Sequence, residues 1–497
     1  MPPDRPYSPS RAIAELPEGF FDVVEPAAFP QHTLRFRNQR WAERVGLHTL
    51  HDDEWEAAFA RFEPLPGSLP LPLAMRYHGH QFRAYNPDLG DGRGFLFAQL
   101  HDGVDGRLLD LGTKGSGTTP YSRGGDGRLT LKGGVREILA TEMLEALGVR
   151  TSKTFSLFET GESLLRGDEP SPTRSSVLVR LGHSHLRFGS FQRHAHQGRP
   201  DRVRLLADHC IAHHYPSLGD AADPYRALYG EIARRTVALT GGWMVAGFVH
   251  GVLNTDNMNV TGESFDYGPW RWLPRYDPMF TAAYFDRSGL YAFGRQPEAA
   301  AWNLTRLAET FDGVTPPREL LDDLREGFSS WLEAAVVEGV LERLGLRARG
   351  RESDARLVDA LYVFLARSRV GYDQAFFDLY GGMASTTRWG SSPEAVAYEH
   401  DGFGPVRAML EAYEPTEHAA WALAAEPYFL QRTRPESMLI EEVEALWSAI
   451  DERDDWQPLH AKIEAVRAMG RALGRREPIS SSPGPQPGPH PNRARGR

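Results

Sequence analysis

The segment HGVLNTDNMNVTGESFDYG, residues 250–268, carries side chains suited to phosphate chemistry. Asn257 offers an amide oxygen and Asp266, nine residues later, offers a carboxylate. Both are hard oxygen ligands of the kind that Mg²⁺ takes while it bridges phosphate groups. We expect a short hairpin through VTGES to bring these two side chains to the same end of two strands. Asp256 is the only carboxylate in the loop beside Asn257, so we expect it to accept or orient a hydroxyl proton. An ordinary turn rich in Asn and Asp is the alternative.

The spacing of this segment matches kinase-type phosphotransferases with one change. Those enzymes place His-Arg-Asp ahead of an Asn and follow it with Asp-Phe-Gly. Here His250 stands seven residues before Asn257, and Asp266 opens an Asp-Tyr-Gly triplet, but Val252 takes the place of the proton-accepting aspartate. Because valine cannot accept a proton, the site is either an inactive kinase or one in which Asp256 does different work. We expect His250 to hold the loop together by hydrogen bonds.

Two glycine-rich segments precede this motif. In NPDLGDGRGFLFAQL, Gly90 and Gly92 would let the backbone approach phosphate oxygens, and the guanidinium of Arg93 would neutralise them. A β-hairpin with Asp-Gly in its turn explains the same residues without a ligand. In SGTTPYSRGGDGR, Asp126 and Gly127 either contact a nucleotide through a carboxylate and a backbone amide or simply form a turn.

Four charged residues complete the candidate site. Lys114 ends the β-like run RLLDLGTK, and Glu137 lies in the first turns of the helix predicted next. This order is the layout in which a kinase lysine is held on the phosphates by an ion pair. Arg180 and Arg187 stand seven residues apart after a β-like run, and their planar guanidinium groups suit phosphate oxygens. The alternative for all four is an ordinary solvated surface position.

The elements that must position these residues predict an α+β fold. Residues 1–72 are rich in proline and read as a wrapping arm with one helical patch at Trp55–Phe62. Residues 73–316 alternate β-like runs, glycine-rich turns and amphipathic helices, and they contain every chemical motif. Residues 317–478 are helical in pattern. The tail, residues 479–497, is too rich in Pro and Gly to pack and is expected to be disordered.

Apolar stripes predict three helices in particular. One ends at Gly148 as a C-cap, one extends through Tyr225–Phe248, and one begins after an N-cap at Ser353. The stripe of the first helix is Val135, Ile138, Leu139, Met143 and Leu147, and that of the third is Leu357, Leu361, Phe364 and Leu365.

The composition limits the possible partners and location. The chain has 497 residues, 41% of them apolar, with a net charge of −10 and a pI near 6.0. This acidic balance argues against nucleic acid or an anionic membrane as a partner. The most apolar stretch, Trp243–Leu253, is far shorter than the ~20 residues of a membrane span. The start of the sequence has no apolar signal segment, and a single cysteine, Cys210, excludes an intrachain disulfide, so a cytoplasmic protein is expected.

Six motifs occur in order between Met75 and Glu309, namely GDGRG, KGSGTTPYSRGGDGR, REILATE, SHLRFGSFQ, HGVLNTDNMNVTGESFDYGP and QPEAAAWNLTRLAE. Together they closely resemble the selenoprotein O family of kinase-like proteins. The resemblance implies a protein-kinase-like fold with a β-rich N-terminal lobe, a helical C-terminal lobe and a helical C-terminal extension. It also implies that ATP binds flipped relative to ordinary kinases and presents its α-phosphorus, so that the product is an AMP-modified Ser, Thr or Tyr of a protein substrate.

The resemblance also implies a role for each candidate residue. Lys114, Arg180 and Arg187 would bind the triphosphate, with Glu137 paired to Lys114. Asp256 would accept the proton, and Asn257 and Asp266 would hold Mg²⁺ or Mn²⁺. The residues that would line the nucleotide site are Gly90, Gly92, Arg93, Asp126 and Gly127. Many family members have a selenocysteine or cysteine near the C-terminus, whereas this sequence has only Cys210. An ordinary γ-phosphoryl kinase and an inert ATP-binding scaffold are the alternatives.

Overall fold

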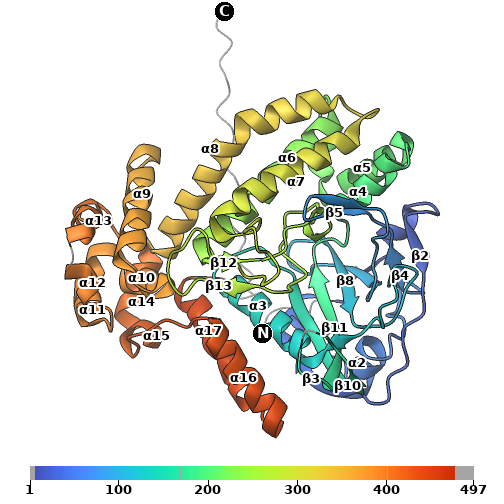
Figure 1. Cartoon of the computed structure of the whole chain (residues 1–497), viewed down its shortest axis with the longest axis horizontal. Coiled ribbons are helices and arrows are strands. Elements are labelled where there is room, and N and C mark those ends of the chain that lie inside the picture. Colours follow the sequence, from blue (N-terminus) through green and yellow to red (C-terminus); the bar gives the residue numbers. More distant parts are fainter. Residues whose placement is uncertain (1–5, 168, 400, 476–497) are drawn as a thin grey trace, which may run out of the picture.

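The computed structural model of this chain describes residues 6–475, apart from residues 168 and 400. Strands gather in one half of the molecule, and long helices fill the other (Figure 1). This combination of helices with antiparallel strands is the α+β class that the sequence predicts. The tail that we expected to be disordered, residues 479–497, lies outside the described residues. None of the described helices has both the length and the apolar character needed to cross a membrane.

An antiparallel sheet dominates the first half of the chain. Its strands are β1 (Pro9–Ser10), β2 (Phe21–Val23), β3 (Thr33–Arg37), β4 (Leu73–Met75), β7 (Leu96–His101), β8 (Leu108–Lys114), β9 (Leu129–Thr130), β10 (Lys153–Leu164) and β11 (Thr173–Gly182). The main path runs in the order β2, β4, β7, β8, β11, β10, β3, while β1 pairs with β7 and β9 pairs with β11. The two ends of this path, β2 and β3, therefore both come from the beginning of the chain.

The segment before residue 73 does more than wrap around the core, because it supplies β1, β2 and β3. It also forms two short helices, α1 (Gln39–Arg44) and α2 (Asp52–Phe59). The helical patch predicted to reach Phe62 stops earlier, since Phe62 has a φ of 58°, which a right-handed helix does not allow. The indole of Trp55 stacks on Phe155 of β10 and ties α2 to the sheet. The division of the chain at residues 72 and 316 stays a prediction.

The sheet is buried on both faces, as the alternation of side chains in β11 shows. Val177 and Val179 join the apolar cluster under α2, whereas Leu178 between them joins the cluster under helix α3 (Leu131–Ala146). Thr130 caps α3 by accepting a hydrogen bond from the third residue of the helix, and Gly148, with a φ of 82°, follows its end as predicted. The predicted stripe of α3 is buried, so its periodicity identified the face that packs on the sheet.

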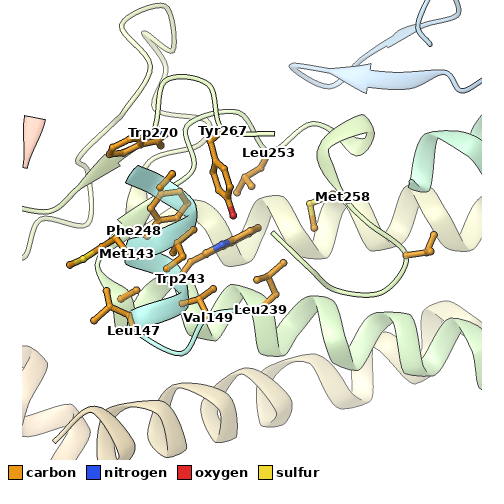
Figure 2. Packing of buried hydrophobic residues seen from close by; sticks show 14 of the residues in the cluster. Met143, Leu147, Val149, Leu239, Trp243, Phe248, Leu253, Met258, Tyr267 and Trp270 are labelled. Carbon is orange, nitrogen blue, oxygen red and sulfur yellow. The ribbon is translucent and has the colours of Figure 1, made fainter. Parts of the chain in front are cut away.

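The helical half is built around α6 (Pro224–Ala246), the long helix expected near Tyr225–Phe248. Figure 2 shows Trp243 of α6 among side chains from the end of α3 and from the segment that contains the chemical motif. The core therefore lies directly beneath that segment. The other helices are α4 (Phe188–His196), α5 (Pro200–His214), α7 (Gln296–Ala308), α8 (Pro317–Arg343), α9 (Arg351–Ser368), α10 (Tyr372–Asp378), α11 (Thr386–Ser391), α12 (Val396–Glu399), α13 (Gly404–Leu410), α14 (Glu417–Ala425), α15 (Pro427–Leu430), α16 (Ile440–Arg453) and α17 (Gln457–Ala472).

Helix α9 corrects one prediction about a helix start. Its predicted apolar stripe is buried, but the helix begins at Arg351, with Gly350 rather than Ser353 as the N-cap. The Asp354 carboxylate reaches back to the backbone N–H groups of Arg349 and Gly350 at 3.0 and 3.1 Å. A carboxylate near the start of the helix thus satisfies two backbone donors of the segment that leads into it.

Candidate active site

A cleft of about 770 Å³ lies between the glycine-rich loops, the end of β8 and the segment from Val252 to Pro269. Eleven of the twelve predicted site residues line it, and they are Gly90, Gly92, Arg93, Lys114, Asp126, Gly127, Arg180, Arg187, Asp256, Asn257 and Asp266. Glu137 is the twelfth, and it reaches the cleft through Lys114. Residues scattered over 177 positions of sequence are thus brought to one concave surface.

The two glycine-rich loops lie in direct contact at the mouth of the cleft. A Cβ atom on Gly90 would stand 2.3 Å from the ring of Tyr121, and one on Gly92 would stand 2.8 Å from the Tyr121 carbonyl oxygen. The alternative of a hairpin turn is wrong here, because β7 pairs with β1, β4 and β8, while β6 (Ala84–Asn86), which precedes this turn, pairs with β5 (Gly79–Gln81). The glycines are therefore needed for loop-to-loop packing, and this packing shapes the cleft wall.

Asp126 and Gly127 close the second loop. The Asp126 carboxylate accepts hydrogen bonds from the Arg166 guanidinium at 2.7 and 3.2 Å, so it already has a cationic partner at the rim. Gly127 has a φ of 69°, and a Cβ there would lie 2.2 Å from the Gly117 carbonyl carbon. This position accepts only glycine without displacing backbone, whether or not a nucleotide is bound.

Lys114 is held between two carboxylates. Its Nζ lies 2.5 Å from Oε1 of Glu137 on α3 and 2.7 Å from Oδ1 of Asp266. Lys114 is 5% exposed and Glu137 is 1% exposed, so the surface alternative for this pair is wrong. Strand β8 and helix α3 fix the two partners, since the strand packs in the apolar cluster under α2 and the helix packs in the cluster on the other face of the sheet.

Asp266 lies at the centre of a cluster of positive charge. Nη1 of Arg180 is 3.6 Å and Nη1 of Arg187 is 3.9 Å from its carboxylate, in addition to Lys114. Burial opposes ionisation of Asp266, but the charges of Lys114, Arg180 and Arg187 outweigh it and hold its pKa well below the usual range. Three cationic side chains thus converge on this side of the cleft, and their N–H groups suit a polyanion.

The two arginines are buried, and they retain unused donors. Nη1 of Arg180 and Nε of Arg187 have no hydrogen-bond partner within the described part of the chain. Both guanidinium groups stack on the ring of Phe265, at 5.1 and 5.0 Å from its centroid. The alternative of solvated loop arginines is therefore wrong, because these side chains are rigidly placed donors inside the cleft wall.

Asp256 is a buried carboxyl group with an unusual environment. It sits in a short 3₁₀ turn, Thr255–Asn257, is 8% exposed, and has an Oδ1 atom without a hydrogen-bond partner in the described residues. Burial raises the pKa of Asp256 to about 6, although the nearby Arg187 guanidinium acts in the opposite direction. A carboxyl group that exchanges its proton near neutral pH is suited to general-base work.

Asn257 and Asp266 could hold a divalent cation. Asn257 donates from Nδ2 to the Val252 carbonyl oxygen at 3.0 Å, which leaves its Oδ1 as the ligand atom, and the Asp266 carboxylate lines the same cleft. An amide oxygen and an ionised carboxylate are ligands that Mg²⁺ or Mn²⁺ accepts. These residues fit such an ion.

The hairpin expected between Asn257 and Asp266 is absent. Instead, Asn259 forms an isolated bridge with Arg187, and Ser264 forms one with Thr151. The segment pairs with elements far away in sequence rather than with itself, because residues 150–152 and 186–188 supply the backbone partners. The asparagine-rich segment is therefore held in the wall of the cleft by backbone hydrogen bonds to these two distant segments.

Nearly the whole chain matches one protein family. The sequence model described as "Protein adenylyltransferase SelO" matches residues 6–467. The chain belongs to the SelO family. It is similar to the protein nucleotidyltransferase YdiU of Gloeobacter violaceus, with 45% identity over 93% of this chain and 95% of that protein. The YdiU proteins of Trichormus variabilis and Thioalkalivibrio sulfidiphilus are 42% and 37% identical, over 93% and 92% of this chain and 96% and 95% of their own lengths.

Membership of the SelO family confirms the resemblance seen in the six motifs, and it identifies the chain as a nucleotidyltransferase. The cleft is consistent with that class of reaction, because it combines three buried cationic side chains with two oxygen ligands and a buried carboxyl group. His250 has the bracing position that we expected. Its Nε2 lies 3.1 Å from the Phe265 carbonyl oxygen, and its ring packs beside Trp243 and Tyr267.

Two residues that line this SelO-family cleft, Asp91 and Tyr77, and one that packs against its arginines, Phe265, were missed in the sequence. Asp91 accepts hydrogen bonds from Nη2 of Arg187 at 3.2 Å and pairs with Nε2 of His185 at 2.8 Å, and the Tyr77 ring lies 4.5 Å from the Arg187 guanidinium. The ring of Phe265 packs against both arginines. Asp91 stands inside the GDGRG motif, so its position was a usable signal, whereas no local pattern marks Tyr77.

Proposed function

We propose that this protein transfers AMP from ATP to Ser, Thr or Tyr hydroxyl groups of other proteins, on a protein-kinase-like fold. The observation that carries the proposal is the placement of Asp256 and of the three cations around Asp266 in one cleft, with Val252 in the position of the kinase base. The printed names of the family and of its YdiU members support nucleotidyl transfer to proteins.

The kinase-like fold is supported by the arrangement around Lys114. A lysine on a central strand of an antiparallel sheet pairs with a glutamate on the helix that packs against that sheet, and the cleft separates this half from the helical half. Protein kinases position their phosphate-binding lysine in the same way.

In this mechanism the triphosphate is bound by Lys114, Arg180 and Arg187. The unused donors of the two arginines face a negative ligand, and the buried setting strengthens each charge-assisted hydrogen bond. The residues that line the rest of the nucleotide site are Gly90, Gly92, Arg93, Asp126 and Gly127. The flipped orientation of ATP that the family resemblance implies would put the β- and γ-phosphates against these cations and the α-phosphorus toward Asp256.

Asn257 and Asp266 would hold Mg²⁺ or Mn²⁺, and a bound ion would supply charge neutralisation of the phosphate groups. Asp256 takes the proton of the acceptor hydroxyl as its oxygen attacks the α-phosphorus and the bond to pyrophosphate breaks. The proton passes to the Asp256 carboxylate, so the carboxyl group must be ionised at the start of the reaction.

Incubation of the purified protein with protein acceptors and ATP labelled on the α- or the γ-phosphate tests this function. AMP transfer predicts α-label on the acceptor and none from γ-labelled ATP. A protein kinase would give the opposite result, and an inert ATP-binding scaffold would give neither label. The variant Val252→Asp sharpens the test, since restoring a carboxylate at the kinase position should not produce γ-label if the orientation of ATP decides the product. Transfer of γ-label by that variant would contradict the flipped orientation.

A further inference from the structure

A second cluster of side chains, Glu15, His209 and His213, has the composition of a metal site and does not line the active-site cleft. Each residue offers one ligand atom, and these atoms lie within 4.8 Å of one another. Nε2 of His213 is 2.7 Å from Oε2 of Glu15. His209 and His213 are four residues apart on α5, so their rings stand on the same face of the helix, with centroids 4.6 Å apart.

An ion pair between His213 and Glu15 explains only part of this cluster. His209 is 6% exposed, and its Nε2 has no hydrogen-bond partner among the residues that the structure describes. A buried polar atom without a partner costs free energy, so such an atom in a native protein calls for an explanation. Burial also disfavours the charged form of an imidazole, which leaves His209 neutral and able to donate a lone pair.

We infer that Glu15, His209 and His213 bind a divalent transition-metal ion, with Zn²⁺ as the best fit. Two imidazole nitrogens and one carboxylate oxygen form a His₂Glu ligand set, which Zn²⁺ accepts with water in the fourth position. Mg²⁺ and Ca²⁺ prefer oxygen ligands only, and Mn²⁺ binds such mixed ligand sets more weakly than Zn²⁺, so Zn²⁺ is favoured here. A shift of the exposed Glu15 carboxylate from His213 to a shared ion is sufficient to complete the set.

Such an ion would join two distant parts of the chain. Glu15 ends a 3₁₀ turn, Ala12–Glu15, which is fixed to the sheet by a hydrogen bond from Ile13 N to Gln99 Oε1 at 2.7 Å. Helix α5 packs against α4 and α6 in the helical half. The ion would therefore hold the first strands of the sheet to the helical half, and its role would be structural.

Full-length protein without an affinity tag, stripped with EDTA, tests this site when it is titrated with ZnSO₄ in a calorimeter and heated with and without Zn²⁺. The expected result is one tight equivalent of Zn²⁺ and a higher melting temperature. The Asp266→Ala variant should keep that equivalent, which separates it from any ion in the active-site cleft. Co²⁺ in place of Zn²⁺ should give the visible absorption of a four-coordinate ion.

His213→Gln and Glu15→Gln should each weaken Zn²⁺ binding by at least ~100-fold, because even outer-shell changes lower metal affinity by ~10–100-fold. Both positions are solvent-accessible, and circular dichroism checks that the fold is retained. The matched control is His196→Gln, an exposed histidine on α4 whose ring lies 5.7 Å from His78. Absence of a tight Zn²⁺ equivalent, or an equal loss in the control and the two test variants, would overturn the proposal.

Discussion

At Asp256 two effects act on one proton in opposite directions. Burial raises its pKa to about 6, and Arg187 partly offsets this. If Asp256 accepts the proton, α-label transfer should fall as the pH drops through about 6, because the protonated form cannot act as a base. Asp256→Asn should lower kcat by the ~10²–10⁴-fold typical of a lost general base and should remove this acidic limb. Measured kcat–pH profiles of both proteins check this, and an unchanged acidic limb in the variant would assign the limb to another group.

Asp256 should also lower the free energy of unfolding at neutral pH. A raised pKa in the folded state means that the native protein holds the proton more tightly than the unfolded chain, so stability falls as pH rises from the unfolded value toward 6. The free energy of unfolding of Asp256→Asn should therefore exceed that of the parent by ~1–3 kcal/mol at pH 7.5, since each pKa unit corresponds to ~1.4 kcal/mol. Near pH 3.5 the gain should disappear. Urea denaturation at both pH values measures it, with the exposed Asp312→Asn as the control.

Lys114 and Glu137 should act as one unit. Lys114→Met should lower kcat/KM by ~10²–10³-fold, the usual loss for one preorganised donor. Glu137→Gln should lower it less, and the double variant should be little worse than Lys114→Met, because the glutamate works by placing the lysine. Lys132 and Glu444 form an exposed pair at 2.7 Å and serve as the matched control, with no expected effect on turnover. Additive losses at the buried pair would show that the two residues work independently.

At the scale of elements, the two glycine-rich loops pack closely because Gly90 and Gly92 have no side chain to separate them from Tyr121. Gly90→Ala should displace the Tyr121 ring, which a new Cβ would approach to 2.3 Å, and so open the cleft wall. We expect weaker ATP binding and a loss of ~1–3 kcal/mol in the free energy of unfolding, as for an overpacked site. ATP titration and chemical denaturation measure the two effects. Gly390→Ala on α11 is the control, because its new Cβ would meet no atom within 4 Å, and an equal effect there would argue against a steric cause.

The contrast between helices and strand pairings shows what a sequence reveals. The stripes of α3 and α9 predicted their buried faces because helix periodicity is a local signal. The predicted hairpin between Asn257 and Asp266 was wrong, since Asn259 and Ser264 find their partners at Arg187 and Thr151. The alternative of a hairpin at the first glycine-rich loop was also wrong, since β7 does not pair with β6. Pairing between distant segments depends on how the whole chain folds back, which no short pattern records. The cleft residues could be found because their types and order carry the chemistry, but supporting groups such as Tyr77 could not.

At the scale of the whole molecule, the C-terminal helix α17 supports the helix that carries Glu137. Arg467 holds the Glu142 carboxylate of α3 with two hydrogen bonds, at 2.8 and 2.7 Å, and Glu142 is 3% exposed (Figure 1 places α17 beside α3). Arg467→Met should destabilise the fold by ~1–3 kcal/mol, because Glu142 would keep only part of its charge compensation. It should also lower turnover by loosening α3. Denaturation and kcat measurements check both effects.

The control for Arg467 is Arg453→Met on α16, which removes an exposed pair with Glu452. Surface pairs of this kind contribute ~0–1 kcal/mol, so stability and turnover should stay close to those of the parent. If Arg467→Met lost stability with no change in kcat, the C-terminal region would support the fold without reaching the catalytic lysine.

These long-range contacts also determine when the chain can complete its fold during synthesis on the ribosome. Strand β3 emerges early, but its partner strand β10, in which Ser156 pairs with Arg37, is made more than 100 residues later. The contact of α3 with Arg467 forms only after α17 has been made. The roughly 300 residues between β10 and α17 take ~15–60 s to translate at typical rates. Throughout that interval the nascent chain already contains its glycine-rich loops and Lys114. Helix α3, which carries Glu137, still lacks the hydrogen bonds from Arg467. A growing chain should therefore acquire its transferase activity only near the end of translation.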